Sequence, residues 1–209
     1  MRNHMKIIVR GGRILNPSDK TDIIGDLYIE DGVIKEIGET LKTKETPDKV
    51  INAKGCYVMP GLIDLHVHLR DPGLTYKEDV VTGAKAGAKG GFTTILAMPN
   101  TKPVIDQGQK VSDVHKRAAE ESLTHVIQLG AVTVGQKGEE LADIKGMAEA
   151  GCHAISEDGK SVMNASLYRK GMKLAKEAGI SVFAHCEDIS MVEGGVMNAD
   201  ENAKILGLK

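Results

Sequence analysis

Aromatic residues are scarce in this chain: tryptophan is absent, and the 209 residues include only two Phe and four Tyr. Its core must therefore be built from Val, Ile, Leu, Ala and Met, which suits the closely packed layers of an α/β protein. The three cysteines, Cys56, Cys152 and Cys186, lie far apart and form no C-x-x-C pair. This spacing argues against a disulfide framework, so we expect a cytoplasmic protein in a reducing compartment.

Charge of one sign and long apolar runs are also missing. The formal net charge is −2, and no basic run follows one face of a predicted element. We therefore expect neither nucleic acid nor an anionic membrane surface as a partner. No apolar run reaches the ~20 residues of a membrane-spanning helix, which likewise predicts no membrane partner.

Residues 1–58 have the pattern of short strands separated by turns. Asp31 and Gly32 stand between two β-rich runs, and this dipeptide is a strong hairpin signal. The polar stretch 39–48 predicts a loop. We expect this part of the chain to form a small antiparallel, sandwich-like β domain.

Residues 59–209 alternate between strand-like and helix-like stretches. The predicted strands are 62–66, 92–97, 124–132, 153–156 and 180–185, and the predicted helices are 76–89, 108–122, 139–150 and 165–178. This alternation indicates βαβ units and a parallel sheet. Five units fit either an open doubly wound sheet or a (β/α)8 TIM-like barrel cut short, since a whole barrel needs roughly 250 residues.

The position of the polar residues favours the barrel. No G-x-G-x-x-G fingerprint follows the first predicted strand, as an open dinucleotide-binding sheet would require. Polar side chains instead follow the carboxyl ends of several strands, where barrel enzymes place their active sites. We therefore expect the first five or so βα units of a partial barrel in residues 59–209.

The most specific motif is a pair of histidines, His66 and His68, at the end of the apolar run 59–65. Side chains at i and i+2 of a strand point to the same face, so both imidazoles can share one metal ion. Arg70, at i+4, would lie on that face if the strand continued so far. A cation beside a metal suggests a site for an anionic substrate.

Four further residues are candidates with open alternatives. Asp158 can bind metal, with Glu157 as the competing ligand, or it can shape a turn before a glycine. His185, at the end of the fifth predicted strand, is a metal ligand or a structural histidine. Asn100 binds a carboxylate or carbonyl group of a substrate or shapes its own turn, and the sequence alone favours the turn.

Two neighbours of these candidates also have alternative roles. Asp64 either orients a histidine ligand or forms a local hydrogen bond. Cys186 is a zinc ligand or a packing residue, and packing is favoured because its side chain would face away from that of His185 in a strand.

Together these motifs resemble dihydroorotases of the bacterial type I group, which belong to the amidohydrolase superfamily of metal-dependent (β/α)8 barrels. The similar segments are 64–73 (DLHVHLRDPG), 98–101 (MPNT), 155–159 (ISEDG) and 184–188 (AHCED). The resemblance covers essentially the whole chain. The combination of motifs is specific, whereas the histidine pair alone would indicate only the superfamily.

The resemblance implies a metal site for one or two zinc ions in the barrel mouth. His66 and His68 would bind the first zinc, and Asp158 would be the carboxylate ligand between metals. His185 would bind a second zinc, or lie close to a single one.

The resemblance also implies the reaction, which is the interconversion of N-carbamoyl-L-aspartate and L-dihydroorotate in pyrimidine biosynthesis. Arg70 and Asn100 would hold the α-carboxylate of the substrate. Zinc would activate water and polarise the ring carbonyl, and an aspartate would carry the proton to the leaving nitrogen.

The family pattern needs a further histidine ligand and this aspartate, and both would lie beyond Lys209. We therefore expect a catalytic residue outside this chain, and we expect the 209-residue piece to be incomplete and inactive alone. At full length we expect a homodimer, with aspartate transcarbamoylase as a further candidate partner.

Two alternatives remain at this point. An allantoinase- or hydantoinase-like enzyme is disfavoured by Arg70, because those substrates lack the α-carboxylate, and by Asp158, which stands where those enzymes carry a metal-bridging lysine. A non-catalytic partner of aspartate transcarbamoylase is disfavoured because the metal ligands are retained.

Overall fold

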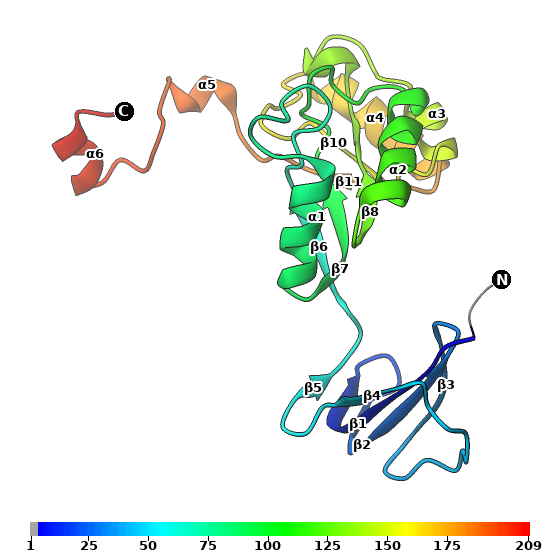
Figure 1. The fold of residues 1–209 in the computed structure, drawn as a ribbon. Coiled ribbons are helices and arrows are strands. Elements are labelled where there is room, and N and C mark those ends of the chain that lie inside the picture. Colours follow the sequence, from blue (N-terminus) through cyan, green and yellow to red (C-terminus); the bar gives the residue numbers. More distant parts are fainter. Residues whose placement is uncertain (1–3) are drawn as a thin grey trace. The chain divides into compact units, whose positions relative to one another are not determined.

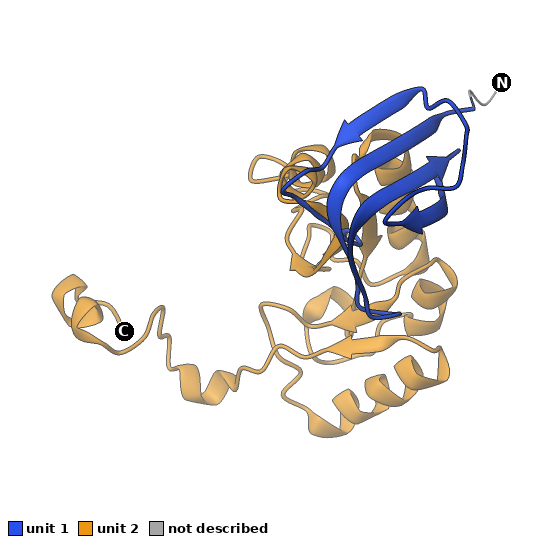
Figure 2. Ribbon diagram, turned by 90° about the horizontal axis from the view of Figure 1, so that it is seen from below, with its two compact units in different colours: residues 1–61 blue, residues 62–209 orange. Residues whose placement is uncertain are grey.

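The computed structural model describes residues 4–209. The chain divides into two compact units, Met1–Gly61 and Leu62–Lys209 (Figure 2). Across residues 4–209, no helix is both long and apolar enough to cross a membrane.

The first unit is a single sheet of five strands (Figure 1). Its strands are β1 (Lys6–Asn16), β2 (Thr21–Glu30), β3 (Val33–Gly38), β4 (Lys49–Asn52) and β5 (Tyr57–Val58). The order is β3-β2-β1-β4, and β5 also pairs with β1. Both β4 and β5 run parallel to β1, so the expectation of a purely antiparallel sheet is wrong. The strand β3 already runs in the direction of β1, and the long connection 39–48 carries the chain back across the sheet, so that β4 starts again in that direction.

The predicted hairpin between β2 and β3 is confirmed. Asp31 and Gly32 both have positive φ, 53° and 77°, as the two central residues of a type I′ turn require. Between Val9 and Gly12 the pairing of β1 with β2 shifts register, so β1 is one long but irregular strand.

The second unit contains two parallel three-stranded sheets. One has the order β6-β7-β8, from β6 (Leu62–Val67), β7 (Phe92–Ala97) and β8 (His125–Gln128); the other has the order β11-β10-β9, from β9 (Gly130–Ala131), β10 (Ala154–Ser156) and β11 (Ser181–Phe183). The predicted strand 124–132 is therefore wrong as a single element. It is divided at Leu129, and its two halves pair in different sheets.

Helices lie between most of these strands and after the last one. They are α1 (Val80–Lys89), α2 (Gly108–Glu121), a 3-10 turn η1 (Val134–Gln136), α3 (Ile144–Glu149), α4 (Ala165–Glu177), α5 (Ile189–Val192) and α6 (Glu201–Leu206). The first helix begins later than predicted because Asp79 and Thr82 form a capping box there. The third also begins late, where the Asp143 side chain accepts a hydrogen bond from the backbone of Gly146.

The helices and strands of the second unit share a core of aliphatic side chains. Its largest fully buried members include Ile95, Ile105, Ile144, Met147 and Ile155. Burial of each such side chain contributes about 1.5–3 kcal/mol, so this core holds the ends of β7 and β10 in place. The strand β6 differs, because Leu62, Ile63 and Leu65 are exposed along it.

Candidate metal centre

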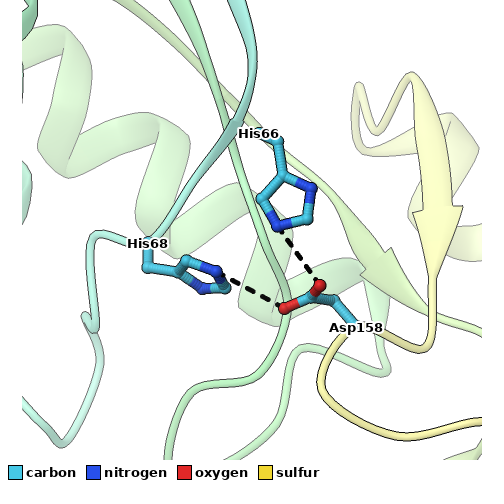
Figure 3. A group of neighbouring side chains, drawn as sticks. All are labelled: His66, His68 and Asp158. Atoms are coloured by element: carbon cyan, nitrogen blue, oxygen red, sulfur yellow. Dashed lines mark ion pairs between the residues drawn. The ribbon is translucent and has the colours of Figure 1, made fainter. Parts of the chain in front are cut away.

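Three potential metal ligands converge in the second unit: His66, His68 and Asp158 (Figure 3). One ligand atom from each lies within 4.8 Å of the others. Residues 4–209 contain one such group of His, Cys, Asp or Glu side chains. Two of its members leave β6 and its end, and the third follows β10.

The two histidines direct the same ring atom toward the carboxylate. His66 Nε2 is 3.2 Å from Asp158 Oδ1, and His68 Nε2 is 3.5 Å from Asp158 Oδ2. The ring centroids are 5.1 Å apart, with 67° between the ring planes. The i, i+2 spacing therefore does what the sequence predicted, and it brings both imidazoles to one carboxylate.

Burial and hydrogen bonds hold Asp158 in place. Its side chain is 7% exposed, and β10, which leads to it, is buried at all three positions. Asn100 Nδ2 donates to Asp158 Oδ2 over 2.8 Å, and Gln136 Nε2 donates to the Asp158 backbone carbonyl over 3.1 Å. Side chains from two other loops thus hold this residue.

Asn100 connects the two sides of the cluster. Its Oδ1 lies 3.0 Å from His68 Nδ1, and since an amide oxygen only accepts, the histidine must donate from this nitrogen. The neutral ring then carries its lone pair on Nε2, the atom that faces Asp158. This bridge is neither of the two alternatives that the sequence left open for Asn100.

His185 lies beside this group without belonging to its closest three. Its Nδ1 is 3.7 Å from Asp158 Oδ1, and its Nε2 is 2.6 Å from Glu187 Oε2. The structure therefore brings the predicted histidine next to the predicted carboxylate, with a second carboxylate on the other side of the ring.

Glu157 faces away from the cluster, so its interpretation as the competing ligand is wrong. Its carboxylate accepts hydrogen bonds from the backbone of Val132 and Thr133, at 3.0 and 3.1 Å, and from the Thr133 hydroxyl. Burial raises the pKa of this carboxyl. Neighbouring residues leaving a strand point in opposite directions, which separates Glu157 from Asp158.

The open alternatives for Asp64 and Cys186 are also decided by contacts. Asp64 Oδ1 accepts a hydrogen bond of 3.0 Å from the backbone N–H of His66, which is the local role. The Cys186 thiol is exposed and lies outside the group of three ligands, so it is neither a packing residue nor a member of that group.

Arg70 does not continue the strand, because β6 ends at Val67 and Arg70 has a φ of 57°. The argument that placed it on the histidine face by i+4 spacing is therefore wrong. The next residue of its loop, Asp71, forms an ion pair with Arg117. The Arg70 side chain is partly exposed, and within residues 4–209 no ion pair to it is recorded.

Sequence reasoning missed Gln136, which holds the backbone of Asp158. Gln136 lies in η1 with a φ of 53°, a backbone geometry that ordinary residues rarely adopt. No motif marks it, since only the packing of β9 beside β10 brings it within reach of Asp158.

The donor set suits a zinc ion. Two imidazole nitrogens and a carboxylate oxygen are typical zinc ligands, and bonds of about 2.0–2.2 Å place neighbouring ligands about 3.3 Å apart in a tetrahedron. The histidine–aspartate distances of 3.2 and 3.5 Å, each to a different oxygen of the carboxylate, are close to this spacing. In the described chain, no Lys or Arg forms an ion pair with the buried Asp158, so a metal cation would supply the missing positive charge.

Comparison with known families identifies the chain. The family described as "Dihydro-orotase-like" matches residues 55–209. The chain belongs to this family. The match contains every residue of the cluster and the whole of the second unit.

Curated relatives support the same assignment. A dihydroorotase from Geotalea daltonii is 49% identical over 98% of this chain and 48% of its own length. A dihydroorotase from Geobacter sulfurreducens is 46% identical over the same shares. The chain spans about half the length of the curated relatives it matches.

Solved structures with a similar fold include an L-hydantoinase from Arthrobacter aurescens. It superposes with a TM-score of 0.76 at 21% identity, over 90% of this chain and 42% of that one. A dihydroorotase crystal structure gives a TM-score of 0.64 at 17% identity, over 88% and 51%. At these identities the likeness shows the fold alone, which is α/β.

Proposed function

We propose that this chain is the N-terminal part of a dihydroorotase, which interconverts N-carbamoyl-L-aspartate and L-dihydroorotate with the help of zinc. The observation that carries this proposal is the convergence of His66, His68 and Asp158 in a chain that matches dihydroorotases over 98% of its length. The substrate would be a small molecule, and de novo pyrimidine biosynthesis in the cytoplasm would be its setting.

We further propose that the two parallel sheets are consecutive parts of the wall of a (β/α)8 barrel. The support is that all strands of residues 62–209 run parallel to their neighbours. Asn100, Asp158 and His185 each follow the carboxyl end of a strand, and barrel enzymes place their active sites at this end. Residues 1–58 would then be the N-terminal part of a separate β domain.

Zinc would be held by His66, His68 and Asp158, with His185 as the ligand of a second ion or as a neighbour of a single one. When bound, zinc supplies Lewis acidity, which activates water near neutral pH and polarises a carbonyl group. The protein contributes the geometry. Asn100 selects the ring nitrogen that His68 presents, and the buried end of β10 keeps the carboxylate in place.

Arg70 is our proposed anchor for the substrate's α-carboxylate, since a guanidinium pairs with a carboxylate through two parallel hydrogen bonds. Asn100 is a second candidate for this contact. Its amide already bonds to His68 and Asp158, so it would have to exchange one of these bonds to reach the substrate. A further histidine ligand and the proton-carrying aspartate would come from beyond Lys209.

The proposal is tested on the full-length protein that contains this chain. Metal is removed by chelation, zinc is restored, and turnover of dihydroorotate is measured in both directions, with hydantoin as a comparison substrate. We expect activity that disappears with the metal and returns with zinc. Zinc-independent turnover, no turnover at all, or a preference for hydantoin would contradict the proposal.

Arg70→Ala separates substrate binding from metal binding. We expect the KM for dihydroorotate to rise roughly 10-fold or more, because a desolvated charge pair with the substrate is lost, while the zinc content stays unchanged. Arg169→Ala, which removes an exposed arginine on α4, is the matched control. An equal loss of zinc and of substrate affinity would refute the carboxylate-anchor role.

At full length we propose a homodimer, and aspartate transcarbamoylase as a further partner. The 209-residue piece alone would be inactive, because two groups of the site would be missing from it. Measurable turnover by this piece would overturn that part of the proposal.

A further inference from the structure

The imidazole of His185 lies between two carboxylates. On one side, Nε2 is 2.6 Å from Glu187 Oε2, and on the other, Nδ1 is 3.7 Å from Asp158 Oδ1. A carboxylate can only accept at neutral pH, so Nε2 donates its proton to Glu187. The lone pair of the neutral ring is then on Nδ1, the atom that faces the metal cluster.

We propose that Glu187 is a positioning residue that fixes the tautomer and orientation of His185 and thereby makes Nδ1 of His185 a metal ligand. This inference rests on the proposed function, because it assumes that a metal ion occupies the cluster. A carboxylate hydrogen-bonded to the far nitrogen of a ligating histidine holds the ring and raises its basicity.

The three histidines differ in the group that contacts the imidazole ring away from Asp158. His68 has the neutral amide of Asn100 behind it, at 3.0 Å. His185 has a carboxylate, which is a stronger hydrogen-bond acceptor than a neutral amide. His66 has the most exposed side chain, at 52%, and only its backbone N–H is held, by Asp64. The carboxylate thus supports the one ring that lies farthest from Asp158.

The surroundings of Glu187 allow it to act through His185 alone. The segment after β11 is held independently, because the Ser161 hydroxyl donates to the His185 backbone carbonyl over 3.1 Å. A cavity of about 300 Å³ lies beside the ring and is lined by both His185 and Glu187. The Glu187 side chain is 38% exposed, so its removal would not open a buried core.

The neighbouring residue supplies a matched control. Asp188 lines the same cavity, but its carboxylate accepts hydrogen bonds from the backbone and hydroxyl of Ser190 instead of from the histidine. Asp188→Asn therefore removes the same charge from the same segment without touching His185. A general electrostatic effect of a nearby carboxylate would appear equally in both variants.

The experiment compares full-length wild-type protein with Glu187→Ala, Glu187→Gln and Asp188→Asn. Zinc affinity is measured by competition with a chelator, and the tautomer of His185 is read from ¹⁵N NMR of the zinc-free protein. For Glu187→Ala we expect a 10–100-fold loss of zinc affinity and a mixture of tautomers. For Glu187→Gln the loss should be smaller, since the amide oxygen still accepts from Nε2, and Asp188→Asn should stay within about twofold of the wild type.

Wild-type zinc affinity and an unchanged tautomer in Glu187→Ala would overturn the inference. An equal loss in Asp188→Asn would also overturn it, because charge rather than positioning would then explain the effect. The proposed function is judged separately, by zinc-dependent turnover of the wild-type protein. A failure of one conclusion is therefore distinguishable from a failure of the other.

Discussion

The two strands that bring the potential metal ligands together, β6 and β10, differ strongly in burial. The strand β6 carries His66 and leads to His68, and most of its apolar side chains are exposed. The strand β10 leads to Asp158, lies in the centre of its sheet and is completely buried. The strand that leads to the carboxylate is therefore fixed by the core, whereas the strand that leads to the histidines has little apolar packing to hold it.

Each strand also has a carboxylate close to its ligand, and these two carboxylates differ in the same way. Asp64 accepts one backbone hydrogen bond and remains partly exposed. Glu157 is 3% exposed and accepts from two backbone N–H groups and a hydroxyl. We therefore expect Glu157 to contribute more to the stability of the fold than Asp64, because it is buried and Asp64 is partly exposed.

The largest effect should come from Asp158→Asn. The substitution keeps the shape but removes the negative charge that balances the metal, so zinc affinity should fall by more than the 10–100-fold that is typical of supporting residues. Zinc content after dialysis measures this change. The unfolding midpoint should be little altered, and retention of stoichiometric zinc would remove Asp158 from the ligand set.

Glu157→Ala and Asp64→Ala compare the two supporting carboxylates directly. Removing the Glu157 side chain opens a cavity and leaves the buried N–H and O–H donors that it binds without an acceptor. We therefore expect a loss of about 2–4 kcal/mol in the free energy of unfolding. Removing Asp64 should cost about 1 kcal/mol or less, because water can replace it. Urea unfolding of the full-length variants measures both, and equal losses would contradict the contrast between the strands.

Asn100→Ala breaks the link between the two strands. Without the amide, His68 can rotate and protonate either nitrogen, so we expect roughly a 10-fold loss of zinc affinity with the fold intact. Chelator competition measures the affinity, and Asn164→Ala, at the start of α4, is a control for amide removal. A loss of substrate affinity with unchanged zinc affinity would instead favour the substrate role of Asn100.

The smallest effect should come from His115, which lies away from the cluster and supports the end of β8. Its Nε2 accepts a hydrogen bond of 2.9 Å from the backbone of Gln128, and burial lowers its pKa. The folded state therefore binds this proton less readily than the unfolded state. Its contribution to stability is complete above the unfolded pKa of about 6.5 and is lost as the pH falls through the lowered value.

In His115→Gln the free energy of unfolding should accordingly fall less between pH 7 and pH 5 than in the wild type. This difference should be smaller than the stability loss expected for Glu157→Ala. Urea unfolding at a series of pH values measures this change. The exposed His125 supplies a comparison, because its charge also lowers the pKa of His115, by less than burial does, so His125→Gln should flatten the decline only slightly. An identical pH profile in His115→Gln would show that this buried histidine is not responsible.

Local patterns predicted most of the elements. The Asp-Gly hairpin, four of the five predicted strands of the second unit and the paired histidines follow from turn chemistry and from periodicity, which act between residues close in sequence. The same patterns misplaced the start of two helices, because the capping side chains of Asp79 and Asp143 decide these positions. They also missed the division of the strand at Leu129.

The sequence by itself determined which chemical groups this protein offers: two histidines on one strand face, a carboxylate, a further histidine, and motifs that place the chain in its family. Only the tertiary structure decided that Asp158 rather than Glu157 faces the histidines, that Asn100 bridges His68 and Asp158, and that Gln136 holds the carboxylate's backbone. These contacts join residues 22 to 92 positions apart in the chain. They depend on how the strands pair and which face of each is buried, and no local pattern carries that information.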